Sequence, residues 1–258
     1  MASADLDYKV ALAHSTARAW FKRHLSLTDT ARPLLPSRPG RPDKPDLLPP
    51  RAMPKRSIAG ERGRLALVHS LAHIELNAID LAWDLVARTA RLPLPRLFFD
   101  NWVQVGLEEA KHFQLLARRL EEMESCYGAL PAHDGLWQAA QSTGHNLIAR
   151  LAIIPLVLEA RGLDITPPMV EKVRAQDDHK TADILEIIYR DEKRHVAFGT
   201  KWFLYACNRH GLKPEPTFHD MVRKYFRGAL RPPFNDRARS QAGLTPGFYK
   251  PLAGLTAI

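Results

Sequence analysis

Four helical patterns in this sequence each place one glutamate in the middle of an otherwise apolar stripe, and two add a histidine three residues later. Burying a carboxylate is costly unless a cation or hydrogen-bond donors compensate its charge. A chain that buries four of them must therefore bring its helices together around a common partner. The polar residues on the four stripes are Glu75, Glu109, His112, Glu159, Glu192 and His195.

The two Glu-x-x-His motifs belong to an internal repeat. Glu109 follows Glu75 by 34 residues, and Glu192 follows Glu159 by 33. A single motif is weak evidence, since roughly 0.5 are expected by chance at this composition. The repeat instead predicts two copies of one unit: a helix with a glutamate, a turn, and a helix with Glu-x-x-His. In a four-helix bundle, the copies would bring four carboxylates and two imidazoles to one level.

The rest of the pattern indicates an all-α protein, since no alternating β-branched run competes with the helical periodicity. The short connection between the first two core helices makes them antiparallel neighbours. We divide the chain into an N-terminal helix with a Pro-rich arm (1–57), the bundle (58–212), and a C-terminal helix with an irregular tail (213–258). The expected helices cover 5–25, 61–90, 96–125, a segment ending at Gly162, 168–209 and 216–229.

Glycine and proline residues indicate helix boundaries and a kink in the second half of the pattern. Gly162 is interpreted as a helix stop, and Thr-Pro-Pro at 166–168 as the N-cap and first turn of the next helix. Pro155 lies inside a helical pattern, one turn before the third glutamate, and predicts a kink. The chain must cross the length of the bundle between the second and third core helices, so we expect a helix start near Ser142 or Thr143.

The segment from Leu27 to Ser57 contains eight prolines and predicts a solvated connector. The net charge of +9 lies at the two ends of the chain. Residues 1–60 carry 11 basic and 5 acidic side chains, and residues 211–258 carry 8 and 3. Such ends can contact a polyanion, although most basic tails are simply solvated.

Composition indicates the compartment. The two cysteines, Cys126 and Cys207, form no CxxC motif, so neither a disulfide framework nor a cysteine zinc site is indicated. The N-terminus lacks the apolar core of a signal peptide. The longest apolar stretch, Leu151 to Leu158, is too short to span a bilayer. We therefore expect a cytoplasmic protein that does not associate with membranes.

The six polar residues on the buried stripes form a metal-ligand set. Four carboxylates packed in an apolar core would repel one another and lose their hydration. Two divalent cations supply about four positive charges and remove this objection, with each imidazole binding one metal. Oxygen donors with some nitrogen suit iron or manganese, as a homonuclear or a mixed pair, better than zinc or calcium. The alternative is a metal-free, hydrogen-bonded polar core.

The ligand set is similar to that of the ferritin-like superfamily of di-iron carboxylate proteins. The phrases HSLAHIELNAIDLAWDL, LPAHDGLW, LVLEARGLDITPP and RPPFNDRARSQAG resemble the domain-of-unknown-function family 455. This resemblance extends from about Ser57 to the C-terminus. It implies a ferritin-like fold with a di-iron-type site, and it implies no particular substrate.

An acidic residue precedes each Glu-x-x-His motif, namely Glu108 and Asp191. A histidine that binds a metal usually donates its other N–H to a carboxylate. We therefore expect Asp191 to meet His112 and Glu108 to meet His195, the alternative being that one or both face solvent. An Asp-Glu-x-x-His stretch is also similar to that of the ribonucleotide reductase small subunit.

Other polar side chains are expected to lie outside the site. His69 and His73 point away from Glu75 and are assigned structural roles, with a hydrogen bond to the arm or tail as the alternative. His145 is about 21 Å along its helix from the third glutamate. Tyr189 is interpreted as a core tyrosine, with a redox role as the alternative. The tail residues expected to cover the site are Phe234, Asn235, Arg237 and Arg239.

The leading functional hypothesis is an oxidoreductase in which two iron ions activate O₂ to oxidise or hydroxylate a small organic substrate. The electron donor is undetermined, and a dimer is compatible with the sequence. A second hypothesis is iron handling, as a ferroxidase or storage protein. A third is a tRNA-directed hydroxylase that binds nucleic acid through its basic arm and tail.

Overall fold

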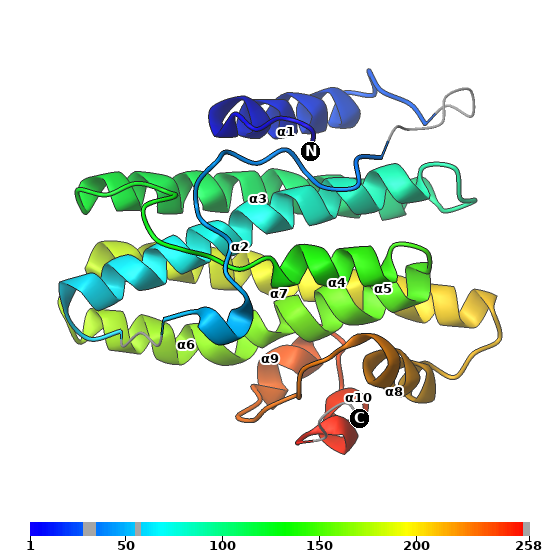
Figure 1. Ribbon diagram of the computed structural model, residues 1–258. Helices are drawn as coiled ribbons and strands as arrows, with labels where there is room; N and C mark the ends of the chain where they lie inside the picture. Colours follow the sequence, from blue (N-terminus) through cyan, green and yellow to red (C-terminus); the bar gives the residue numbers. More distant parts are fainter. Residues whose placement is uncertain (28–34, 55–57, 255–258) are drawn as a thin grey trace. The chain divides into compact units, whose positions relative to one another are not determined.

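The computed structural model describes residues 1–27, 35–54 and 58–254 (Figure 1). Within these ranges every regular element is helical, and the only β-type pairings are two isolated bridges, Leu47 with Ala132 and Leu230 with Ala253. The prediction of an all-α protein is therefore confirmed.

The chain divides into two compact units, and each is described here by itself. The first comprises Met1–Trp137 and Lys172–Ile184, and the second Gln138–Glu171 and Leu185–Ile258. The helices of the first are α1 (Leu6–Phe21), η1 (Pro50–Ala52), α2 (Gly60–Thr89) and α3 (Arg96–Glu122). Those of the second are α5 (Leu147–Ile153), η2 (Ile154–Glu159), α8 (Pro214–Tyr225), α9 (Asp236–Gln241), α10 (Pro246–Tyr249) and η3 (Lys250–Leu252). The helices that contribute residues to both units are α4 (Gly135–Thr143), α6 (Ala160–Arg174) and α7 (His179–Arg209).

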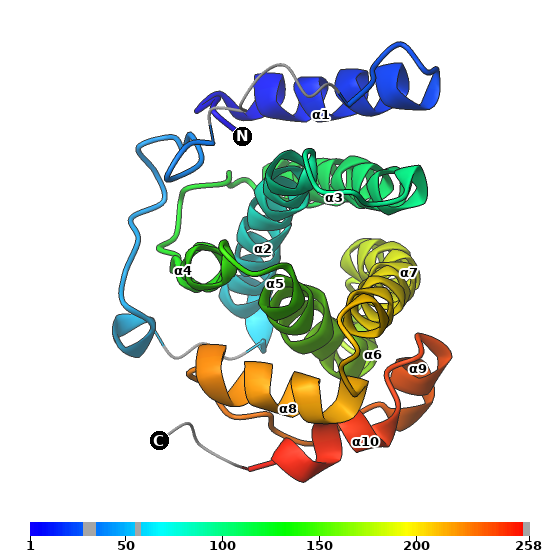
Figure 2. The same cartoon turned by 90° about the vertical axis from the view of Figure 1, so that its right-hand side faces the viewer.

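Helices α2 and α3 form an antiparallel pair in the first unit (Figures 1 and 2). Glu75 on α2 contacts His112 on α3, whereas Trp83, two turns later on α2, lies against Gly106, earlier on α3. A Cβ atom at Gly106 would lie 2.8 Å from Nε1 of Trp83, so glycine allows the two helices to approach closely here. The predicted antiparallel pair is confirmed.

Helix α1 packs on α3 (Figure 2). Asp5 caps its N-terminus by accepting a 2.9 Å hydrogen bond from the Tyr8 amide. At the other end, Trp20 packs against Phe99 and donates a 2.8 Å hydrogen bond to Asp100. The predicted N-terminal helix is therefore confirmed as an integral part of the first unit.

The Pro-rich arm corrects the prediction of a solvated connector. In its described part, residues 35–54, Pro39 and Pro45 are buried. Arg41 forms a 3.0 Å ion pair with Asp80, a fully buried residue of α2. A buried carboxylate requires a paired charge, so this contact holds the arm against α2. The rest of the predicted connector lies outside the described residues.

Two histidines of α2 anchor the loop between α3 and α4. Nε2 of His69 accepts a 3.0 Å hydrogen bond from the Gly128 amide. The His73 ring lies 2.8 Å from the Tyr127 hydroxyl through Nδ1 and 3.0 Å from the His133 carbonyl through Nε2. The Tyr127 ring stacks on both imidazoles. The structural role predicted for these histidines is confirmed, but their partner is this loop rather than the arm or tail.

The protonation state of His73 makes the stability of this loop pH-dependent. A carbonyl oxygen can only accept, so Nε2 donates to His133 and Nδ1 accepts from Tyr127. Burial lowers the pKa of His73 from 6.5 to about 4. A second proton would occupy Nδ1, which could then no longer accept the hydrogen of the Tyr127 hydroxyl. The unfolded chain therefore binds this proton at a higher pH than the folded protein does, and stability is lost as pH falls from about 6.5 to about 4.

We expect the wild-type protein to lose about 2–3 kcal/mol more unfolding free energy between pH 7 and pH 4 than His73→Gln does. Urea denaturation at the two pH values measures this difference. Each protein is compared with itself at the two pH values. A destabilisation by the substitution that is the same at both pH values therefore does not affect the difference. Equal losses in the two proteins would contradict the assignment of a neutral His73.

Helix α6 corrects the predicted boundary between the third and fourth core helices. It continues through both Gly162 and the Thr-Pro-Pro sequence at 166–168, and α7 begins only at His179. Pro167 has no amide to donate to the Leu163 carbonyl, as a residue four positions later in a helix would. Nδ2 of Asn235 donates to that carbonyl instead, at 3.1 Å. A partner distant in sequence thus makes a proline in the helix interior acceptable.

Pro155 lies in the π-helical turn η2, which ends at Glu159. The helix departs from α-helical geometry here as a π-helical turn, whereas the kink expected at Pro155 stays a prediction. The approach of α7 is close at this point. A Cβ atom at Gly199 would overlap Cβ of Pro155 and lie 2.7 Å from its Cγ.

The crossover segment contains a helix that the sequence analysis did not predict. Ser142 and Thr143 end α4 instead of starting a new helix, which is a correction. The next helix, α5, starts after Asn146, whose side chain accepts a 2.9 Å hydrogen bond from the Ala149 amide. Asn is among the best N-cap residues, and this cap sets the start of the helix.

The C-terminal tail is more ordered than the predicted irregular segment, because it contains α9 and α10 (Figure 2). Arg239 forms a bidentate contact with Asp164 of α6, at 2.8 and 2.7 Å, and both residues are buried. Phe234 packs on Tyr249, with ring centroids 4.9 Å apart, whereas Arg237 is exposed. A buried, bidentate ion pair of this kind ties the tail firmly to α6.

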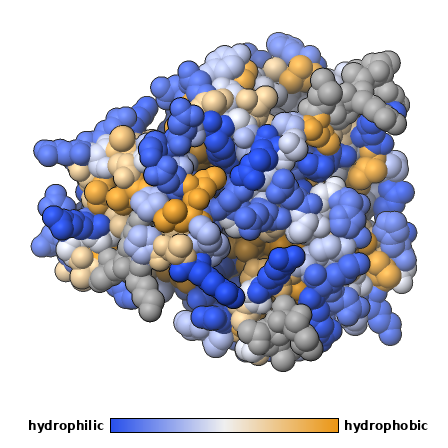
Figure 3. Space-filling model, in the orientation of Figure 1, coloured by the Kyte–Doolittle hydropathy of each residue, from blue (hydrophilic) through white to orange (hydrophobic). Residues whose placement is uncertain are grey.

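Among the described helices, α2 alone has the length and composition to cross a membrane, and 72% of its most apolar window is buried inside the protein. A core helix has these properties. On the face drawn in Figure 3, hydrophilic side chains predominate and hydrophobic ones form scattered patches.

Candidate metal centre

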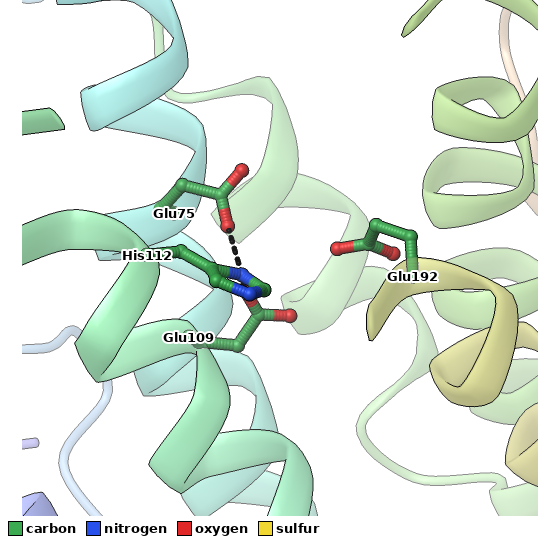
Figure 4. Close-up of side chains that lie close together, drawn as sticks. All are labelled: Glu75, Glu109, His112 and Glu192. Carbon is green, nitrogen blue, oxygen red and sulfur yellow. Dashed lines mark hydrogen bonds and ion pairs between the residues drawn. The ribbon is translucent and has the colours of Figure 1, made fainter. Parts of the chain in front are cut away.

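The first unit brings three of the predicted ligands together. Glu75 lies on α2, and Glu109 and His112 lie one turn apart on α3. Nδ1 of His112 is 3.3 Å from Oε2 of Glu75 and 3.2 Å from Oε2 of Glu109 (Figure 4). Glu109 and His112 are fully buried, and Glu75 is 4% exposed. Figure 4 also draws Glu192, which belongs to the second unit.

The electrostatics of this triad favour the binding of a cation. Burial, and secondarily the charge of Glu109, raise the pKa of Glu75 well above its usual value, while His112 opposes this shift. Two carboxylates that share one imidazole in a dry environment are a costly arrangement without a cation. A bound metal would supply that charge, so the electrostatics of these residues fit a metal site.

The donor chemistry also fits. Each residue of the triad offers one ligand atom, and these atoms lie within 4.8 Å of one another. Carboxylate oxygens with an imidazole nitrogen are ligands that iron and manganese accept. A buried carboxylate and histidine cluster that can hold a metal ion is therefore present in the first unit.

The second unit repeats the motif geometry. Nδ1 of His195 faces Oε1 of Glu192 at 3.5 Å, and the two residues lie one turn apart on α7. Both are buried. Glu159 is half-buried at the end of the π-helical turn η2. In each unit, therefore, the histidine of a Glu-x-x-His motif turns Nδ1 toward its own glutamate.

The acidic residues beside the motifs are buried, contrary to the alternative that they face solvent. Glu108 is 7% exposed and accepts a 2.7 Å hydrogen bond from Gln104. Asp191 is 4% exposed and accepts a 3.1 Å hydrogen bond from Arg194. The expected pairing of Asp191 with His112 and of Glu108 with His195 stays a prediction.

Some residues near the candidate ligands were missed or misjudged by sequence reasoning. Gly199 lies four residues after His195 and packs on Pro155, which lies four residues before Glu159. The equal offsets from the two ligands were a signal that could have suggested this contact. Asn235 was assigned only to a covering tail, and nothing in its local sequence indicates that it contacts α6.

Comparisons with known proteins identify relatives of this chain. Residues 2–250 match the sequence profile of the family described as "Protein of unknown function (DUF455)". An uncharacterized protein of Haemophilus influenzae is 41% identical over 210 residues, which cover 78% of this chain and 72% of that protein. No solved structure matches the chain. The matched family profile spans nearly the whole sequence, and the chain is a member of the DUF455 family.

Proposed function

We propose that the two ligand triads join in one dinuclear metal centre, inside a ferritin-like four-helix bundle formed by residues 58–212. The supporting observation is the shared geometry of the two motifs, with Nδ1 of each histidine turned to the glutamate three residues before it. Each triad supplies two carboxylates and one imidazole. A chain with two such triads, both within buried helices, meets the requirement for two metals.

The activity that this centre supports best is that of a di-metal oxidoreductase, with iron as the leading metal and manganese or a mixed pair as alternatives. When bound, the metals would supply electrons to O₂ for the oxidation or hydroxylation of a small organic substrate. Glu75, Glu109 and His112 would hold one side of the centre, and Glu159, Glu192 and His195 the other.

The residues next to the ligands have positioning roles in this proposal. Gln104 orients the Glu108 carboxylate and Arg194 orients that of Asp191. A carboxylate held in this way can accept the N–H of a ligand histidine and so set the orientation of its ring. The expected pairing across the bundle would thereby lock both imidazoles with their Nδ1 atoms toward the metals.

Anaerobic loading with Fe²⁺ followed by O₂ tests this function. We expect two Fe²⁺ per chain, consumption of O₂ and growth of charge-transfer absorption. Zero iron per chain would overturn the metal centre, and two inert ions per chain would overturn oxygen activation. Uptake of many more ions by a large closed oligomer would favour iron storage instead. The tRNA-directed alternative requires an affinity for tRNA that weakens as salt rises.

A further inference from the structure

The C-terminal tail connects α7, which carries Glu192 and His195, with α6, which continues directly from the turn that ends at Glu159. The contact is made by Asn235, the N-cap residue of α9. Nδ2 of Asn235 donates to the Leu163 carbonyl on α6 at 3.1 Å and to the Tyr189 hydroxyl on α7 at 3.2 Å. A carbonyl can only accept, so the amide nitrogen must face Leu163, and both of its hydrogens are used.

These contacts lie close to the ligands along each helix. Leu163 follows Glu159 by four residues, about 6 Å along the helix, and Tyr189 precedes Glu192 by three, about 4.5 Å. The Asn235 side chain therefore bridges the helices about one turn away from the ligand on each of them. A second contact lies on the opposite side of these ligands along each helix. Pro155 precedes Glu159 by four residues, Gly199 follows His195 by four, and Pro155 and Gly199 pack on each other.

The remaining groups of Asn235 fix its own position. Its main-chain amide donates to Oδ1 of Asp164 at 2.9 Å, and its Oδ1 accepts from the Ala238 amide at 3.0 Å. Asp164 is in turn held by the buried guanidinium of Arg239. These hydrogen bonds hold the Asn235 side chain in one position. A residue that sets the spacing of two helices must itself be held in this way.

The carbonyl that Asn235 reaches is the one that Pro167 leaves without a donor. An unpaired carbonyl at this position would make the helix prone to local distortion, within one turn of Glu159. Asn235 both satisfies this carbonyl and ties it to α7. The two effects act on the same quantity, the position of Glu159 relative to Glu192 and His195.

We propose that Asn235 is a positioning residue, which sets the spacing of the helices that carry Glu159, Glu192 and His195. This inference rests on the proposed metal centre. It assigns to the tail a role in building the site, in addition to any role in covering it. Mutation of a residue that orients a metal ligand from outside the coordination shell typically lowers metal affinity by about 10–100-fold.

Asn235→Ser is the informative variant, because serine keeps an oxygen for the N-cap of α9 but lacks the amide that bridges the helices. Asn146→Ser is its matched control, since Asn146 also caps a helix of this unit and lies 13 residues before Glu159. Tyr189→Phe removes only the acceptor on α7 and leaves the cap intact. The probe is Co²⁺, bound to the full chain and followed by its visible absorption and by competition with a chelator.

We expect Asn235→Ser to weaken Co²⁺ binding by at least about tenfold at one of two positions and to shift the visible bands. Tyr189→Phe should do the same to a smaller extent, and Asn146→Ser should match the wild type. Wild-type affinity and spectrum in both bridge variants would overturn the role of Asn235 while leaving the metal centre intact. Absence of Co²⁺ binding by the wild type would overturn the metal centre and this inference with it. If Asn235→Ser fails to fold, Tyr189→Phe decides the question by the same criteria.

Discussion

Glu109→Gln is expected to have opposite effects on stability and on metal binding. In the metal-free protein, the substitution removes a buried negative charge that disfavours ionisation of Glu75. Two buried carboxylates side by side are costly, so replacing one of them by an amide of the same shape should raise the unfolding free energy by about 1–2 kcal/mol. The same change replaces an anionic ligand by a weak neutral one. We therefore expect metal affinity to fall by more than about 100-fold.

Urea denaturation of the metal-free protein and competition with a chelator measure these two quantities. The control is Glu122→Ala, on the same helix, because Glu122 makes only exposed ion pairs with Arg119 and Lys180. We expect it to leave both stability and metal binding close to those of the wild type. Destabilisation by Glu109→Gln, with no effect on metal binding, would show that the triad is a hydrogen-bonded polar core.

Gly199→Ala is expected to disrupt the proposed second ligand triad, Glu159, Glu192 and His195. The new methyl group would overlap the ring of Pro155, which is attached directly to the backbone and cannot rotate away. Either η2 or α7 must then move, within one turn of Glu159 and His195. We expect a loss of about 3 kcal/mol in unfolding free energy and at least a tenfold loss in metal affinity.

Three further variants separate the steric cause from a general effect of replacing glycine. Gly162→Ala on α6 has no atom within 4 Å of the new methyl group, so its expected effect is a stabilisation of up to about 1 kcal/mol. Pro155→Gly removes the overlapping atoms and should restore metal affinity when combined with Gly199→Ala. Pro155→Ala keeps the overlapping Cβ atom and should not. Equal behaviour of the two double variants would contradict the steric explanation.

Much of the candidate site could be predicted from the sequence because the relevant signals are local. An isolated carboxylate in an apolar stripe is visible at helical spacing, as are the two Glu-x-x-His motifs. A short connection also makes two helices antiparallel neighbours, which is enough to place Glu75 beside Glu109 and His112. The structure places these three residues in contact.

The errors concern residues whose behaviour depends on a distant partner. The eight prolines of the arm correctly indicated that it is not helical, yet they could not reveal that Arg41 would pair with the buried Asp80. His69 and His73 were given structural roles from their direction on the helix, and both bind the loop between α3 and α4. The loop that they hold is 54 or more residues away along the chain, so no local pattern identifies it.

Helical class, the helix faces and the identity of the candidate ligands were determined by the sequence alone, because helical periodicity repeats over three or four residues. Only the tertiary structure decided that α6 continues through Pro167 and Pro168. A proline inside a helix leaves a carbonyl without its amide, and the donor that satisfies it, Asn235, lies 72 residues beyond Leu163. The loss of a helical hydrogen bond at Pro167 can thus be read from the local sequence. The hydrogen bond from Asn235 that replaces it forms only when the chain has folded.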